Sequence, residues 1–350
     1  TEANGIGLGT VNVVANALDI QAITGDITNN TSAVTAGDLT LTATADGGAI
    51  GATGAADDIN VTLSGTLTAT ASTGNGGIFI SQTGDLTLGA VNADVTSGGD
   101  VEIETTGTLG TTAAADIVGD NVTLTLAADK LLTVDADTSI TGETNVTLVS
   151  DEMTLSSAGG DLIGAGAGGT LLLRAVENET NLDLGSGAGA DGSGTGDAGT
   201  LALDTTDLGA LDPDSGTIQF GNAAINGDTT ISNGASTLTI NAPLSFFSDD
   251  FTFNADNDAL TSDSTISIDA GGTITDGGGD ETTTDITAID FTIADSTGIG
   301  TDADNALNLS VDNLTITTTS NDAFITEANG IGLGTVNVVA NALDIQAITG

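Results

Sequence analysis

The first 25 residues of this 350-residue chain return, letter for letter, at its end. Residues 1–25 and residues 326–350 both read TEANGIGLGTVNVVANALDIQAITG, at an offset of 325 residues. An identity of this length does not arise by chance, and self-similarity at a fixed period is the signature of repeat architectures. We therefore expect residues 1–325 to form one unit of a tandem array, and residues 326–350 to begin the next identical unit.

A much shorter pattern recurs inside the unit. It consists of one or two turn residues followed by an apolar residue, a threonine and a second apolar residue. Its copies are spaced at intervals centred near 20 residues, as in GDLTL at 37–41, GDLTL at 84–88, DNVTL at 120–124 and DNLTI at 312–316. This spacing suits the coils of a β-solenoid better than the strands of separate domains.

The residues around each copy alternate between apolar and polar. Leu39, Leu41 and Ala43 would face one side of a strand, and the threonines between them the other side. Alternation at period two is the strand signature, and the β-branched residues Thr, Val and Ile favour strands. No stretch keeps a helical period, while Gly, Asp, Asn and Ser fill the gaps as turn residues. The sequence predicts an all-β protein.

Two all-β architectures compete at this point. A string of β-sandwiches could divide 325 residues into three domains of roughly 108 residues each. A β-solenoid would instead stack about 15 coils of about 20 residues in each 325-residue unit. Sandwich cores usually contain large aromatic residues, and this chain has no Trp or Tyr, so we favour the solenoid. One coil buries too few side chains to offset the entropy of ordering its backbone, so coils are stable only in a stack.

The composition excludes several function classes. The chain has 49 acidic residues and only two basic ones, Lys130 and Arg174, so its formal net charge is −47. Binding to nucleic acid requires cations and is therefore not expected. The absence of His and Cys excludes disulfides, His/Cys zinc sites and catalytic triads that use His or Cys. Because 39% of the residues are apolar and the mean hydropathy is +0.20, the chain can form a core rather than remain disordered.

The aspartates are the candidate metal ligands. Oxygen-rich loops are what calcium binds, and several loops contain two closely spaced aspartates. The candidate calcium ligands are four such pairs: Asp57 with Asp58, Asp135 with Asp137, Asp256 with Asp258, and Asp302 with Asp304. Aspartate is also a common turn former and a solubilising surface residue, and no EF-hand loop is present. Both interpretations stay open from the sequence.

The aromatic residues are few but clustered. Phe246, Phe247, Phe251 and Phe253 form the only local aromatic density. We expect them to fill a wider part of the core, with either Phe246 or Phe247 pointing outward by alternation.

Strings such as GDLTLTATADGGAIG and GTLTATASTGNGGIFISQTGDLTLGAV resemble the repeat regions of giant bacterial surface and secreted adhesins of the filamentous-haemagglutinin type. The resemblance implies a right-handed parallel β-helix, export to the cell surface, and adhesive or structural work. It also implies partners: further copies end to end, lateral association into fibres, and surface glycans.

The sequence thus predicts a structural or adhesive extracellular fibre segment and not an enzyme. It shows no catalytic set and no cofactor other than the candidate calcium. No apolar run approaches the roughly 18–20 residues of a membrane helix, so no membrane span is expected. The alternative is a calcium- or glycan-binding adhesin module made of tandem β-sandwich domains.

Overall fold

The computed structural model describes the chain except residues 30–31, 55, 95–97, 158–161, 186–199, 225–226, 235, 255–257, 278–282, 303–304, 318–320, 339–341 and 348–350. The chain divides into two compact units. The first comprises Thr1–Leu172 and Ala210–Asp214, and the second comprises Leu173–Gly209 and Ser215–Gly350.

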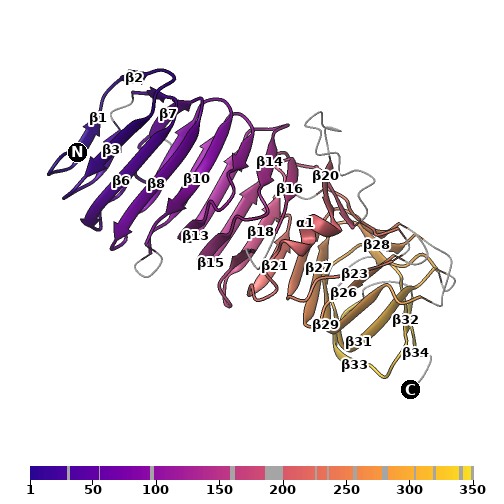
Figure 1. The fold of residues 1–350 in the computed structure, drawn as a ribbon. Coiled ribbons are helices and arrows are strands. Elements are labelled where there is room, and N and C mark those ends of the chain that lie inside the picture. The colour runs from indigo at the N-terminus through magenta and orange to yellow at the C-terminus, as the bar shows by residue number, and fades with distance from the viewer. Residues whose placement is uncertain are drawn as a thin grey trace. The chain divides into compact units, whose positions relative to one another are not determined.

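The strands of the first unit are short and follow one another closely (Figure 1). They are β1 (Ile6–Leu8), β2 (Val11–Val13), β3 (Leu18–Ala22), β4 (Ile27–Asn29), β5 (Val34–Ala36), β6 (Leu39–Asp46), β7 (Ile59–Leu63), β8 (Thr66–Thr73), β9 (Ile78–Gln82), β10 (Leu86–Asn92), β11 (Val101–Thr105), β12 (Leu109–Thr111), β13 (Ile117–Leu126), β14 (Leu131–Val134), β15 (Ile140–Val149), β16 (Glu152–Leu155) and β17 (Ile163–Ala165). The boundary between the units falls within β18 (Thr170–Arg174).

The second unit contains the remaining strands and one short helix. They are β19 (Asn181–Gly185), β20 (Thr200–Asp204), α1 (Thr205–Gly209), β21 (Thr217–Phe220), β22 (Thr229–Ser232), β23 (Thr237–Thr239), β24 (Leu244–Ser248), β25 (Phe251–Phe253), β26 (Ala259–Thr261), β27 (Thr265–Ala270), β28 (Thr273–Asp276), β29 (Ile286–Asp295), β30 (Gly298–Ile299), β31 (Leu307–Ile316), β32 (Ala323–Glu327), β33 (Gly332–Val336) and β34 (Leu343–Ala347).

The strands pair in parallel with strands of neighbouring coils. In the first unit β3 pairs with β6, β6 with β8, and β8 with β10, and Figure 1 shows β6, β8 and β10 side by side. The pairing is in register, so the same core position recurs in successive coils. One buried column of β-branched residues runs through Ile27, Ile50, Ile78, Val101, Val122 and Val146.

This parallel stacking confirms the predicted β-solenoid and overturns the sandwich alternative, because sandwich sheets are antiparallel. The two units hold about 13 turns, fewer than the predicted 15. The coils are on average longer than the predicted 20 residues. Hydrogen bonds between adjacent coils join residues from 19 to 28 positions apart, so the length of a coil varies along the stack.

The core of each unit is lined by small aliphatic side chains, as the alternation predicts. In β6 the residues Leu39, Leu41 and Ala43 are fully buried, while the threonines between them are half-buried. Fully burying one such aliphatic side chain stabilises the fold by roughly 1.5–3 kcal/mol. The repeated apolar–Thr–apolar pattern therefore builds the solenoid directly.

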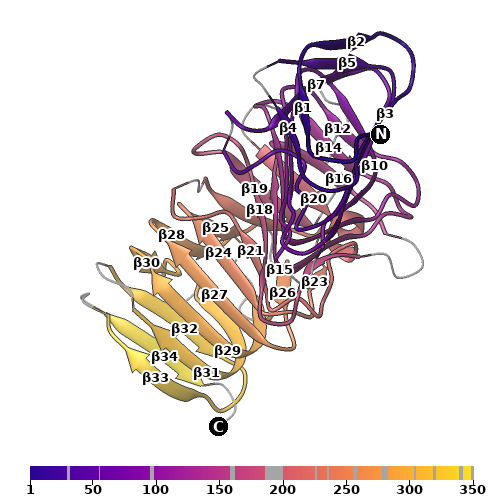
Figure 2. The ribbon, with the colours of Figure 1, turned by 90° about the vertical axis from the view of Figure 1, so that its left-hand side faces the viewer.

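Phenylalanines fill part of the core of the second unit, where strands such as β27, β29 and β31 follow one another in Figure 2. The rings of Phe220 and Phe246 stack with their centroids 5.1 Å apart. Phe251 meets Phe246 edge to face at 5.3 Å, and Phe253 meets Phe251 at 5.6 Å. All four side chains are fully buried, while Phe247 faces outward, as alternation predicts.

Candidate functional site

Aspartates at the corners of the coils bind the backbone of the next coil. The amide of Ala49 donates to Oδ1 of Asp26 at 2.9 Å, and the amide of Thr66 donates to Oδ1 of Asp38 at 2.9 Å. The same contact joins Thr108 to Asp85 at 2.9 Å in the first unit. In the second unit it joins Asp250 to Asp228 at 3.1 Å and Ala342 to Asp322 at 2.9 Å. Hydrogen bonds to a charged acceptor are stronger than neutral ones, so these corners tie successive coils together.

The aspartates predicted as calcium ligands lie on different coils. Asp57 and Asp58 precede β7, Asp135 and Asp137 lie between β14 and β15, Asp258 precedes β26, and Asp302 follows β30. Asp256 and Asp304 lie outside the described residues.

Three of these aspartates accept hydrogen bonds from nearby groups. Oδ1 of Asp135 accepts from the amide of Asp137 at 3.2 Å, and Oδ1 of Asp258 accepts from the amide of Asn233 at 3.0 Å. Oδ1 of Asp302 accepts from Nδ2 of Asn305 at 3.0 Å. In the part of the chain that the structure describes, no group of three or more acidic side chains could hold a metal ion. Calcium binding stays a prediction.

Asp58 stands apart because its carboxyl group is buried. It is only 2% exposed, and within the described residues its Oδ1 has no hydrogen-bond partner. Burial, together with the nearby negative charges of Glu102, Glu104 and Asp57, raises the pKa of Asp58 to about 6. The pKa of Glu102 is also raised, first by burial and then by Glu104 and Asp100. This side of the first unit therefore concentrates negative charge around a buried carboxyl group.

The register of the coils brings these residues together. Ile59 pairs with Ile80, and Glu102 pairs with Phe79, so Asp58 and Glu102 flank Phe79 from opposite sides. The pairs of aspartates in the sequence do not indicate that Asp58 lies beside Glu102. The pattern Val-Glu-Ile-Glu-Thr in β11, with two glutamates on the polar side of a strand, was the available signal.

Asp58→Asn should stabilise the protein at neutral pH. The folded pKa of about 6 lies above the ordinary value of 3.8, so folding favours protonated Asp58. The contribution of Asp58 to stability is therefore fully present below about pH 4, and it is lost as the pH rises through 6. Removing the carboxylate should raise the free energy of unfolding at pH 8 by up to about 3 kcal/mol.

Urea unfolding from pH 4 to pH 8 measures this effect. The stability difference between the variant and the wild type should grow with pH and level off above pH 7. Asp57→Asn is the matched control, because it removes the same charge from an exposed neighbour and should change stability less. A difference between Asp58→Asn and the wild type that does not vary with pH would contradict the prediction.

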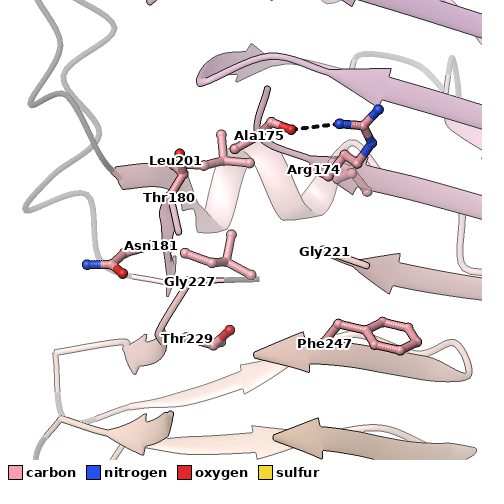
Figure 3. A pocket seen from close by; sticks show the side chains of 11 residues that line it. Arg174, Ala175, Thr180, Asn181, Leu201, Gly221, Gly227, Thr229 and Phe247 are labelled. Atoms are coloured by element: carbon pink, nitrogen blue, oxygen red, sulfur yellow. Dashed lines mark hydrogen bonds between the residues drawn. The ribbon is translucent and has the colours of Figure 1, made fainter. Parts of the chain in front are cut away.

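A small hollow in the second unit lies beside Arg174, the only arginine (Figure 3). The Arg174 guanidinium donates from Nη1 to the carbonyl oxygen of Ala175 at 3.0 Å, and burial lowers the pKa of Arg174. Gly221 and the outward-facing Phe247 also line the hollow. Its volume of about 20 Å³ accommodates roughly one water molecule, so it is not a cavity for a substrate.

The duplicated 25-residue segment makes the same coil-closing contact at both of its positions. In the first copy Glu2 makes a parallel bridge with Ala22, and in the second copy Glu327 pairs in parallel with Ala347. The strand Leu18–Ala22 likewise recurs as Leu343–Ala347. The identical sequence therefore closes its coil by the same contact in two different surroundings.

No family model, no curated protein and no solved structure matches the chain. Within the described residues, no helix is long and apolar enough to span a membrane.

Proposed function

We propose that the protein is a structural spacer: a repeating segment of an extracellular bacterial fibre of the filamentous-haemagglutinin-like kind, which holds adhesive parts away from the cell or coats its surface. The proposal assigns it a mechanical role without a catalytic reaction. The observation that carries the proposal is the duplicated segment, which closes a coil of the parallel stack by the same contact at both positions, Glu2 with Ala22 and Glu327 with Ala347. A stack whose coils repeat can be lengthened without a new fold.

The surface chemistry supports the same role. With a net charge of −47, the surfaces of neighbouring molecules repel one another at low salt, so lateral association into fibres would need screening by salt or divalent cations. The outward threonines and the acidic corners are the surfaces through which glycans or calcium would act. The aspartates at the corners bind backbone amides of the next coil and so link the coils of the stack.

Imaging of tandem arrays tests the proposal. Arrays of one, two and four complete 325-residue copies should appear in negative stain as unbroken thin filaments whose length grows by a constant increment per copy. Beads joined by flexible tethers would refute the spacer role. Imaging in calcium and in chelator would also test the metal prediction, since filaments that require calcium would indicate ligation by the loop aspartates.

A further inference from the structure

The two copies of the duplicated segment are buried on opposite sides. In the first copy Leu8 is 4% exposed and Ala22 is fully buried, because the following coil covers them. Their equivalents in the second copy are open: Leu333 is 56% exposed, and Ala347 is also exposed.

The start of the segment shows the reverse. Thr1 and Glu2 are exposed, whereas their equivalents Thr326 and Glu327 are 9% and 0% exposed. Leu307 pairs with Ile325 and Leu309 with Glu327, so the preceding strand β31 covers the second copy. Among the described residues, each copy is thus covered on one side, and the covered side differs between the two copies.

The strand within the segment uses a different edge in each copy. In the first copy β3 pairs with the following strand β6, with Ile20 opposite Leu41. In the second copy β34 pairs with the preceding strand β32, with Ile345 opposite Ile325. The same Leu-Asp-Ile-Gln-Ala sequence thus has a partner known from the structure for each of its two edges.

We infer that the uncovered face of the second copy, formed by β33 and β34, is a docking surface for a second copy of this chain. Its occupant is the segment equivalent to residues 26–46, which contains β4, β5 and β6. Leu343 and Ile345 then lie opposite the residues equivalent to Leu39 and Leu41, as Leu18 and Ile20 already do. This inference rests on the proposed function, and it specifies the register in which consecutive copies join.

The exposed apolar residues support this occupant. Leu333 and Leu343 are two of the five large hydrophobic side chains that are exposed among the described residues, and both lie on this face. An open strand edge with exposed apolar residues favours the addition of another strand. The first copy shows what such a strand buries, since Leu8 and Ile20 are 4% and 9% exposed beneath it.

Cysteine labelling tests the inference, because the chain has no cysteine of its own. Leu8→Cys and Leu333→Cys place one thiol at the same position of the same sequence in the two copies. In the 350-residue chain, Leu333→Cys should react with a maleimide at least tenfold faster than Leu8→Cys. When a second copy of residues 26–46 is appended directly after Gly350, labelling of Leu333→Cys should slow at least tenfold.

The control extension carries aspartate at the positions equivalent to Leu39, Leu41 and Ala43 and should leave the labelling of Leu333→Cys fast. Hydrogen exchange of the amides in Gly332–Val336 and Leu343–Ala347 gives the same comparison without a cysteine. Equal labelling or exchange with and without the correct extension would overturn the inference, and so would equal protection by the control extension. Such a failure is distinct from failure of the fibre role, which imaging tests separately, because copies could still form a filament through another contact.

Discussion

Leu41→Asp should strongly destabilise the coils around β6 in the first unit, whereas Thr42→Asp in the same strand should have little effect. Leu41 is fully buried in the core, opposite Ile20 in one neighbouring coil and Ala69 in the other. Removing a buried leucine side chain costs about 2–5 kcal/mol, and an unpaired buried carboxyl group adds several more. The sum is comparable with the whole stability of a typical domain.

Thr42 is the matched control because it accepts the same added charge one residue away. Its neighbours in register are Gln21 and Thr70, so the new carboxylate would have no acidic residue directly opposite. A surface substitution of this kind should change the free energy of unfolding by no more than about 0.5 kcal/mol.

Urea unfolding followed by circular dichroism measures both variants, and hydrogen exchange locates the damage. Because each coil contacts only its neighbours, protection should fall most in β3, β6 and β8 and recover along the stack. Equal destabilisation by the two variants would mean that the alternating pattern does not separate core-facing from solvent-facing positions in β6.

The side chains that face the core could be predicted from the sequence, because alternation is a property of residues that are adjacent in a strand. The inward positions Leu39 and Leu41 follow from their spacing alone. The same spacing predicts that either Phe246 or Phe247 points outward, and the structure shows that it is Phe247. The stack of coils follows from the recurrence of the pattern along the chain, whereas its parallel strands are implied by the resemblance to filamentous-haemagglutinin-type repeats.

The number of turns could not be predicted, because it depends on how many residues each loop adds. Most inter-coil hydrogen bonds join residues about 20–24 positions apart, but Asp38 reaches Thr66 across 28 positions and Asn181 reaches Asp228 across 47. Turn residues indicate where a loop lies, and they do not fix how far it extends before the chain rejoins the stack. Dividing the chain by the mean spacing of the short repeats therefore overestimates the number of turns.

The cluster around Asp58 was missed for a related reason. Asp58 and Glu102 are distant in the sequence, and they flank the same phenylalanine only because their coils stack in a particular register. The corner aspartates were ambiguous for a different reason, because turns and calcium sites both place aspartate in loops. The position of each carboxylate relative to the next coil decides its role. It shows whether the carboxylate accepts a hydrogen bond from a backbone amide or has oxygens available to bind a cation.

Gly169→Ala should destabilise the first unit strongly, and Gly168→Ala should not. The two glycines are adjacent in the loop between β17 and β18, but Gly169 is buried and Gly168 is exposed. A Cβ atom on Gly169 would overlap the carbonyl oxygen of Thr144 in the preceding coil, whereas a Cβ atom on Gly168 would meet no other atom within 4 Å.

The difference in stability between the two variants measures the effect of the close contact between Gly169 and the Thr144 backbone. Neither glycine has a positive φ, so alanine restricts the unfolded chain equally at both positions. The overlap at Gly169 involves backbone on both sides, which cannot rotate away, so the loss should be about 3 kcal/mol or more. At Gly168 the expected change lies between zero and a gain of about 1 kcal/mol. Urea unfolding of the two variants measures the difference, and equal stabilities would mean that the loop does not pack against Thr144 as closely as the stacked coils require.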